Sequence, residues 1–218
     1  SDRILSATLF VIWEITGSCN LSCEHCLSSA GKSLPNELST QEAKELLDYL
    51  ETMKVFNINL SGGEPLMRKD IYDIIDYASQ KRFSIDLLTN GALITEKVLD
   101  RLENTNIFNV QVSIDGIGET HDSFRGRKGT YERAINAIKL LRDASYDVSI
   151  SSTVTKQNMS EIPRIIDMAI DLGISSFKTT LFMPAGRGKG NIDKLVLTPQ
   201  DTKDFTYMMI EKKKEVGD

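Results

Sequence analysis

Six strand-like segments alternate with helical segments along almost the whole chain. The strand-like segments are rich in aromatic and β-branched residues, as strands usually are, and we expect them at residues 9–15, 55–60, 83–88, 108–114, 147–154 and 177–182. The first is apolar throughout most of its length, which predicts a buried strand. Six βα units in succession predict a parallel sheet with right-handed crossovers. Because a closed TIM barrel needs eight units, we expect an α/β fold, a (βα)6 partial TIM barrel.

The helices between these strands carry the expected start signals. Ser39 with Glu42 three residues later matches a capping box, and Thr198 with Pro199 marks the start of a last helix. The chain has 218 residues, of which 40% are hydrophobic and 26% charged. This is the balance of an ordinary globular protein, and no Gly-, Ser- or Pro-rich linker interrupts it. We therefore expect one domain over residues 1–218.

The charge balance and the hydropathy exclude some classes of function. The formal net charge is −5, whereas nucleic-acid surfaces show clustered Lys and Arg. No apolar stretch approaches the ~18 residues that a membrane helix needs, and the first residues lack the pattern of a signal peptide. We expect a cytoplasmic protein that binds neither nucleic acid nor a membrane.

All three cysteines, Cys19, Cys23 and Cys26, lie within eight residues of the loop after the first strand. Such an odd, closely spaced set cannot close a disulfide framework, and in a reducing compartment it indicates metal or redox chemistry. Thiolates select iron–sulfur clusters or zinc. A structural zinc site usually has four protein ligands, and the only other candidate nearby is His25, between two of the cysteines. We therefore favour a cluster with three protein ligands and one open iron, over zinc or three inert cysteines.

Polar motifs follow the next three strands, at the carboxyl ends where parallel α/β folds bind ligands. The motifs are Ser61-Gly62-Gly63-Glu64-Pro65, Thr89-Asn90-Gly91 and Ser113-Ile114-Asp115-Gly116. Adjacent glycines permit close backbone approach to a ligand, and the carboxylate of Glu64 suits an ammonium group. Ser113 and Asp115 point to the same strand face and could bind hydroxyl groups, although Asp115 could equally cap the following turn.

Taken together, these motifs resemble those of the radical S-adenosylmethionine (SAM) superfamily, and the resemblance covers nearly the whole chain. It rests on the C-x3-C-x2-C spacing after the first strand, followed in order by the GGEP, TNG and Ser-x-Asp segments. The resemblance implies a [4Fe–4S] cluster on Cys19, Cys23 and Cys26, with SAM chelated by the fourth iron. An electron from a donor such as flavodoxin or ferredoxin then cleaves SAM, and the 5′-deoxyadenosyl radical abstracts hydrogen from a substrate, while the protein positions the cofactor.

The same resemblance implies positions around the methionine part of SAM. It places Gly63 and Glu64 at the amino group and Thr89 near the methionine moiety. Residues 121–126 resemble an HDxxR segment whose arginine, here Arg125, pairs with the SAM carboxylate, a bidentate contact that suits a guanidinium. His121 is expected to support this loop.

Other positions are implied around the nucleoside part of SAM. Ser113 and Asp115 are expected at the ribose. His25 stands where relatives carry an aromatic residue, so we assign it to packing on adenine. Leu181 and Met183 are candidates for apolar contact with adenine.

Residues 16–20, 121–126 and 184–188 resemble the SPASM/twitch subgroup, which modifies ribosomally made peptides or proteins. That subgroup carries auxiliary clusters in a cysteine-rich C-terminal extension, whereas no cysteine follows Cys26 here. The chain is then either the core of a longer enzyme or a relative without auxiliary clusters; we expect the former, with a peptide or small protein as substrate. The alternatives are small-molecule chemistry such as cofactor or haem biosynthesis, or a noncatalytic metal-binding scaffold. No residue indicates a catalytic base or radical quencher.

Overall fold

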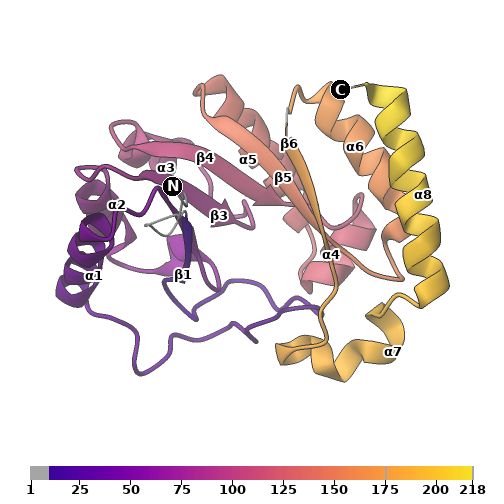
Figure 1. The fold of residues 1–218 in the computed structure, drawn as a ribbon, viewed down its shortest axis with the longest axis horizontal. Helices are drawn as coiled ribbons and strands as arrows, with labels where there is room; N and C mark the ends of the chain where they lie inside the picture. Colours follow the sequence, from indigo (N-terminus) through magenta and orange to yellow (C-terminus); the bar gives the residue numbers. More distant parts are fainter. Residues whose placement is uncertain (1–9, 175, 218) are drawn as a thin grey trace, which may run out of the picture.

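The computed structural model describes residues 10–174 and 176–217, which contain one six-stranded parallel sheet (Figure 1). The strands lie side by side in chain order: β1 (Phe10–Glu14), β2 (Asn57–Ser61), β3 (Ser84–Thr89), β4 (Ile107–Ser113), β5 (Asp147–Val154) and β6 (Ser176–Leu181). The sheet curls and ends at β1 and β6 without closing, which confirms the α/β partial barrel. Residue 9, where we predicted the first strand to begin, lies outside the described residues.

Helices cover the convex side of the sheet (Figure 1). One helix follows most of the strands: α1 (Thr40–Thr52), α2 (Ile71–Ala78), α3 (Glu96–Leu102), α5 (Thr130–Asp143), α6 (Ile162–Asp171) and α8 (Pro199–Val216), which packs on α6. The connecting segments contain α4 (Glu119–Arg125), α7 (Ile192–Leu195) and the 3-10 turns η1 (Pro65–Met67), η2 (Met159–Glu161) and η3 (Gly186–Asn191). Within the described ranges, no helix combines the length and apolar character that crossing a bilayer requires.

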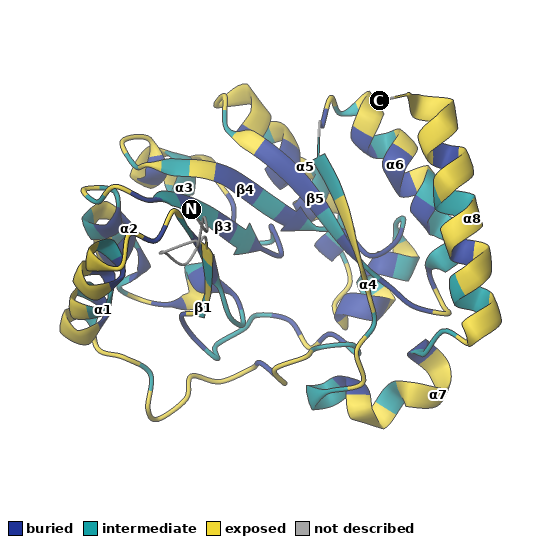
Figure 2. Cartoon of the chain, in the orientation of Figure 1, coloured by how far each residue is buried: buried dark blue, intermediate teal, exposed yellow. Residues whose placement is uncertain are grey.

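The core lies between the sheet and these helices (Figure 2). Alternate residues of a strand point to opposite sides of the sheet, and the side under the helices is apolar: Ile58 and Leu60 of β2 are fully buried, as are Val110 and Val112 of β4. Burying each such side chain stabilises the fold by about 1.5–3 kcal/mol. The strand–helix units are therefore held together by a continuous apolar layer.

The concave side of the sheet is lined by a different set of residues. It carries mostly polar side chains, namely Asn57, Asn59 and Ser61 of β2, Asn109, Gln111 and Ser113 of β4, and Ser149, Ser151 and Thr153 of β5. The prediction that the first strand is buried is wrong. Phe10 and Ile12 pair with Asn57 and Asn59 and are 58% and 61% exposed, because β1 is an edge strand whose inner face borders the hollow of an unclosed barrel.

The predicted helix starts are confirmed. Ser39 and Glu42 cap each other reciprocally at the start of α1, and Thr198 forms the same arrangement with Asp201 at the start of α8. The segment 121–125, which we expected in a loop, instead lies on the short helix α4. This helix stops at Gly126, whose φ of +70° suits the left-handed conformation that glycine adopts without strain.

Candidate functional site

The cysteine loop, residues 15–39, crosses the carboxyl ends of the strands and is fixed at both of its ends. The guanidinium of Arg68, just after the Gly-Gly-Glu-Pro turn, donates to the carbonyl oxygen of Ile15 at 2.8 Å and to that of Leu38 at 2.7 Å. Asp70 accepts two further hydrogen bonds from the same guanidinium. One buried side chain therefore holds the two ends of this loop at a set separation.

The middle of the loop is held by α4 and by the segment after β6. The backbone N–H groups of Ser22 and Glu24 donate to the carbonyls of Arg125 and Phe124. Arg187 donates from its backbone to the Cys26 carbonyl at 3.0 Å and from its guanidinium to the carbonyl of Ala30 at 2.5 Å. Arg187 had no predicted role, and its only signal in the sequence is its place in residues 184–188.

Adjacent glycines let the turn after β2 approach this loop closely. A Cβ on Gly63 would lie 2.2 Å from the carbonyl oxygen of Ser18, and one on Gly62 would lie 2.4 Å from that of Thr16. Gly62 also has a φ of +128°. Side chains are excluded at both positions, so the Gly-Gly pair is required by the contact between the turn and the cysteine loop itself.

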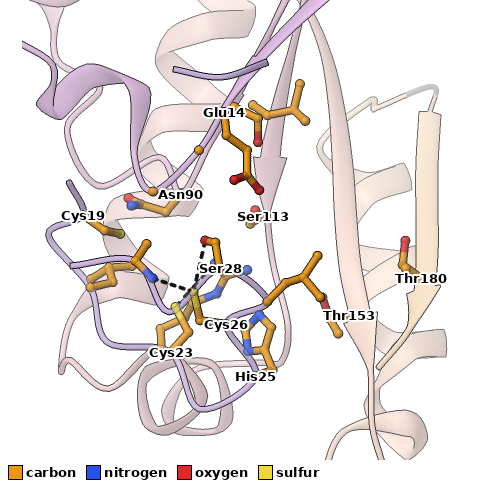
Figure 3. Close-up of a pocket in the computed structure, with 18 of the residues that line it drawn as sticks. Glu14, Cys19, Cys23, His25, Cys26, Ser28, Asn90, Ser113, Thr153 and Thr180 are labelled. Atoms are coloured by element: carbon orange, nitrogen blue, oxygen red, sulfur yellow. Dashed lines mark hydrogen bonds between the residues drawn. The ribbon is translucent and has the colours of Figure 1, made fainter. Parts of the chain in front are cut away.

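The loop and the strand ends enclose a cavity of about 310 Å³ (Figure 3). Cys19, Cys23 and Cys26, all free thiols, line it. The cavity also brings together most of the predicted SAM-binding residues: Gly63, Thr89, Ser113, Arg125, His25, Leu181 and Met183. Glu64 and Asp115 are fully buried behind its wall and do not line it. The roles of all these residues toward SAM stay predictions.

Glu64 joins the ends of two neighbouring strands. Its carboxylate accepts hydrogen bonds from the Thr89 hydroxyl and the Asn90 backbone, each at 2.8 Å, and from the Leu66 backbone at 3.3 Å. Burial nevertheless raises the pKa of Glu64 above its usual value, against the effect of these hydrogen bonds. The GGEP and TNG motifs are thus two halves of one hydrogen-bonded unit.

Asp115 is paired with Arg125 below the cysteine loop. Asp115 Oδ2 lies 2.5 Å from Arg125 Nη2, and Oδ1 accepts from the Thr153 backbone at 2.8 Å. Burial opposes ionisation, but the guanidinium and the neighbouring His25 and His121 together hold the pKa of Asp115 below its usual value. The carboxylate and the guanidinium therefore form a buried ion pair.

The two histidines lie on either side of this pair. The ring of His25 stacks on Phe124, with centroids 4.3 Å apart, and His121 Nδ1 accepts a hydrogen bond from the Asp115 backbone at 3.1 Å. Burial lowers the pKa of each histidine to about 4. Both imidazoles are neutral at pH 7, and the acceptor nitrogen of His121 supports the turn after β4.

The donor set fits the predicted cluster and SAM. Soft thiols suit iron–sulfur chemistry, and Arg125 Nη1 lies 3.9 Å from Cys23 Sγ, where a cation favours the thiolate. Burial raises the pKa of Cys19 and of Cys23, so metal binding would displace protons from them. Among the described residues, no three His, Cys, Asp or Glu side chains converge on a single-ion position.

Two orphaned atoms indicate that a further polar group belongs in the cavity. Arg125 Nε and His25 Nδ1 are buried without a hydrogen-bond partner in the described part of the chain. Buried polar atoms are normally paired. A polar cofactor bound against the cysteine loop would supply such partners.

Sequence reasoning missed the residues on the concave face of the sheet. Glu14, Gln111, Thr153 and Thr180 line the cavity from four different strands. For Gln111 and Thr153 the available signal is the alternation of polar and apolar residues in β4 and β5, whereas Glu14 follows four apolar residues and carries no such signal.

Comparison with known proteins identifies the family. The chain is 38% identical over 213 residues to the mycofactocin maturase MftC of Mycolicibacterium smegmatis, covering 97% of this chain and 54% of MftC. It is 35% identical over 212 residues to the AdoMet-dependent heme synthase of Methanosarcina barkeri, covering 96% of this chain and 60% of that protein. The chain therefore spans between half and two thirds of the length of these relatives.

The fold is similar to that of a solved peptide complex. Streptococcus suis SuiB bound to its precursor peptide SuiA superimposes with a TM-score of 0.83 at 19% identity, covering 98% of this chain and 48% of SuiB. The sequence pattern of the Radical SAM superfamily matches residues 13–189. The predicted cofactors, a [4Fe–4S] cluster and SAM, are those of this family. The chain belongs to the radical SAM superfamily.

Proposed function

We propose that this chain is the core domain of an enzyme that modifies a ribosomally made peptide or small protein. The observation that carries the proposal is that three free cysteines share one cavity with the GGEP, TNG and Ser113 strand ends. When bound, the cluster and SAM supply a 5′-deoxyadenosyl radical that abstracts a hydrogen atom from the substrate. The similarity to a maturase and to a peptide-bound fold supports a peptide substrate.

In this proposal each residue holds a defined part of the cofactors. Cys19, Cys23 and Cys26 ligate the cluster. Gly63 lines the part of the cavity where the methionine part of SAM would bind, and Thr89 contributes its hydroxyl. Arg125 offers its unpartnered Nε to the SAM carboxylate while Nη2 stays on Asp115.

The nucleoside part of SAM would lie against the other side of the cavity. Ser113 would bind the ribose, and His25 and Leu181 would flank the adenine. Asp115 would act on the ribose only through its neighbours, because its carboxylate is buried against Arg125 and Thr153. We also propose a cytoplasmic enzyme that takes its electron from flavodoxin or ferredoxin.

A second candidate is a radical SAM enzyme of haem biosynthesis, which the similarity to the AdoMet-dependent heme synthase favours. The experiment that separates the two uses the full natural chain, reconstituted without oxygen and supplied with SAM and dithionite. One reaction contains a synthetic peptide encoded beside the gene, and the other contains iron-coproporphyrin. We expect a mass change in the peptide only. Conversion of the porphyrin with an unchanged peptide would contradict the proposal.

A further inference from the structure

The concave face of the sheet carries a carboxylate that the fold leaves without a partner. Glu14, the last residue of β1, points from the strand into the cavity between Asn90 and Ser113 (Figure 3). Its carboxylate has neither a hydrogen bond nor an ion pair with any residue of the described chain. The other two carboxylates at this end of the sheet are fully engaged, Glu64 by three donors and Asp115 by Arg125.

Glu14 belongs to a row of residues that crosses the sheet at one level. In the strand register Glu14 lies beside Ser61 of β2, and Gln111 of β4 lies beside Leu88 of β3. All four residues line the cavity. Together they form its floor, opposite the cysteine loop.

A polar floor is not what stability alone would favour. The interiors of closed βα barrels are filled mainly by branched aliphatic side chains, which form a packed core. Here the hollow keeps Glu14 and Gln111 instead, and Glu14 is exposed rather than packed against other side chains. Polar groups that converge in a concave site usually orient a ligand.

The charges of the cavity indicate the chemistry of that ligand. Arg125 is the one Lys or Arg side chain among the described residues that line it, and Asp115 already neutralises that charge. Deeper in the hollow, Oδ1 of Asp86 is buried without a hydrogen bond, and the charge of Lys178 acts on this carboxylate. The field of these groups favours a cation and disfavours a ligand rich in carboxylates.

We propose that Glu14, assisted by Gln111, binds a positively charged nitrogen group of the substrate and orients it toward the cysteine loop. The group is an ammonium or guanidinium, as in lysine, arginine or a peptide N-terminus. This inference rests on the proposed function, because it describes the substrate of the same site. It makes Glu14 a determinant of specificity that the SAM-binding motifs do not include.

The test measures binding of two small probes to the reconstituted, SAM-loaded full chain by ligand-observed NMR titration. The probes are acetyl-Gly-Lys-Gly-amide and its glutamine counterpart. We expect the wild-type protein to bind the lysine probe about 10- to 100-fold more tightly than Glu14→Gln does, the range for one charge-assisted hydrogen bond. The glutamine probe should bind both proteins equally. Asp76→Asn, an exposed position on α2, removes the same charge far from the cavity and should leave the preference intact.

Several outcomes would overturn the inference. One is that the wild type and Glu14→Gln bind the lysine probe with equal affinity, and another is that the wild type does not bind that probe. A third is that Glu14→Gln loses affinity for SAM while its preference between the two probes is unchanged. Iron content measured on each variant shows that the cluster loop is intact. If Glu14→Gln loses iron, Glu14→Asp, which keeps the charge, takes its place and should retain the preference for lysine. Peptide modification is scored separately, so failure of the proposed function would appear as lysine binding without any mass change.

Discussion

Arg125 Nη2 lies 2.5 Å from Asp115 Oδ2, and these two side chains are 9% and 0% exposed. The pair joins the end of α4 to the turn after β4, directly beneath Cys23 and His25. Bringing both charges out of water is costly, and their mutual attraction compensates only while both are present. The pair is therefore a sensitive point of the site.

Replacing Asp115 by asparagine should leave the Arg125 charge buried and uncompensated. We expect the free energy of unfolding to fall by about 3–5 kcal/mol, measured by urea denaturation of the protein without cofactors. Glu211→Gln removes one partner of an exposed ion pair with Lys214, and such pairs contribute little. Equal stability of the two variants would show that the buried pair is not structurally important.

His121 should make the stability depend on pH. Burial, reinforced by the charge of Arg125, lowers the pKa of His121 to about 4 from 6.5. Between these two pH values the unfolded chain binds more protons than the folded protein does, so stability falls as the pH decreases from 6.5 to 4. The loss from this one group amounts to about 3 kcal/mol.

His121→Asn tests this dependence, because the asparagine oxygen can still accept the hydrogen bond from the Asp115 backbone. Urea denaturation across this pH range should give a shallower slope for the variant. The remaining histidine, His25, also has a pKa of about 4, so part of the slope should persist. Identical slopes in the two proteins would contradict the prediction.

Two glycines after β6 provide a matched pair for testing the cysteine loop. Gly186 has a φ of +51°, and a Cβ there would lie 2.2 Å from the Leu27 carbonyl oxygen, whereas a Cβ on Gly190 would meet no atom within 4 Å. Gly186→Ala should cost about 2 kcal/mol or more and reduce the iron retained after anaerobic reconstitution. Gly190→Ala should match the wild type, and equal iron contents in the two variants would count against the loop geometry described above.

The sequence predicted the secondary structure and the residues of the site better than it predicted the tertiary contacts that these residues make. Periodicity and caps such as Ser39 with Glu42 depend on neighbours in the chain, so they can be read locally. The burial of β1 cannot be read from neighbouring residues, because the exposure of Ile12 depends on whether the barrel closes. Likewise, the pairing of Asp115 with Arg125 depends on how α4 folds back on the strand ends.

The polar residues on the concave face of the sheet are also difficult to recognise from the sequence. Glu14 and Gln111 lie among apolar residues that dominate the pattern, and their meaning appears only when the parallel register brings them to one cavity. Arg187 is similar, since its contacts with the cysteine loop join residues more than 150 positions apart in the sequence. Such relationships require the tertiary structure.

The central claim is that Cys19, Cys23 and Cys26 together hold the cluster that cleaves SAM. The most direct measurement is 5′-deoxyadenosine formed by anaerobically reconstituted protein supplied with SAM and dithionite, with iron quantified in the same samples. We predict product for the wild type, and neither a full complement of iron nor 5′-deoxyadenosine when any one of the three cysteines is replaced by alanine. Turnover retained in any of these variants would contradict the account.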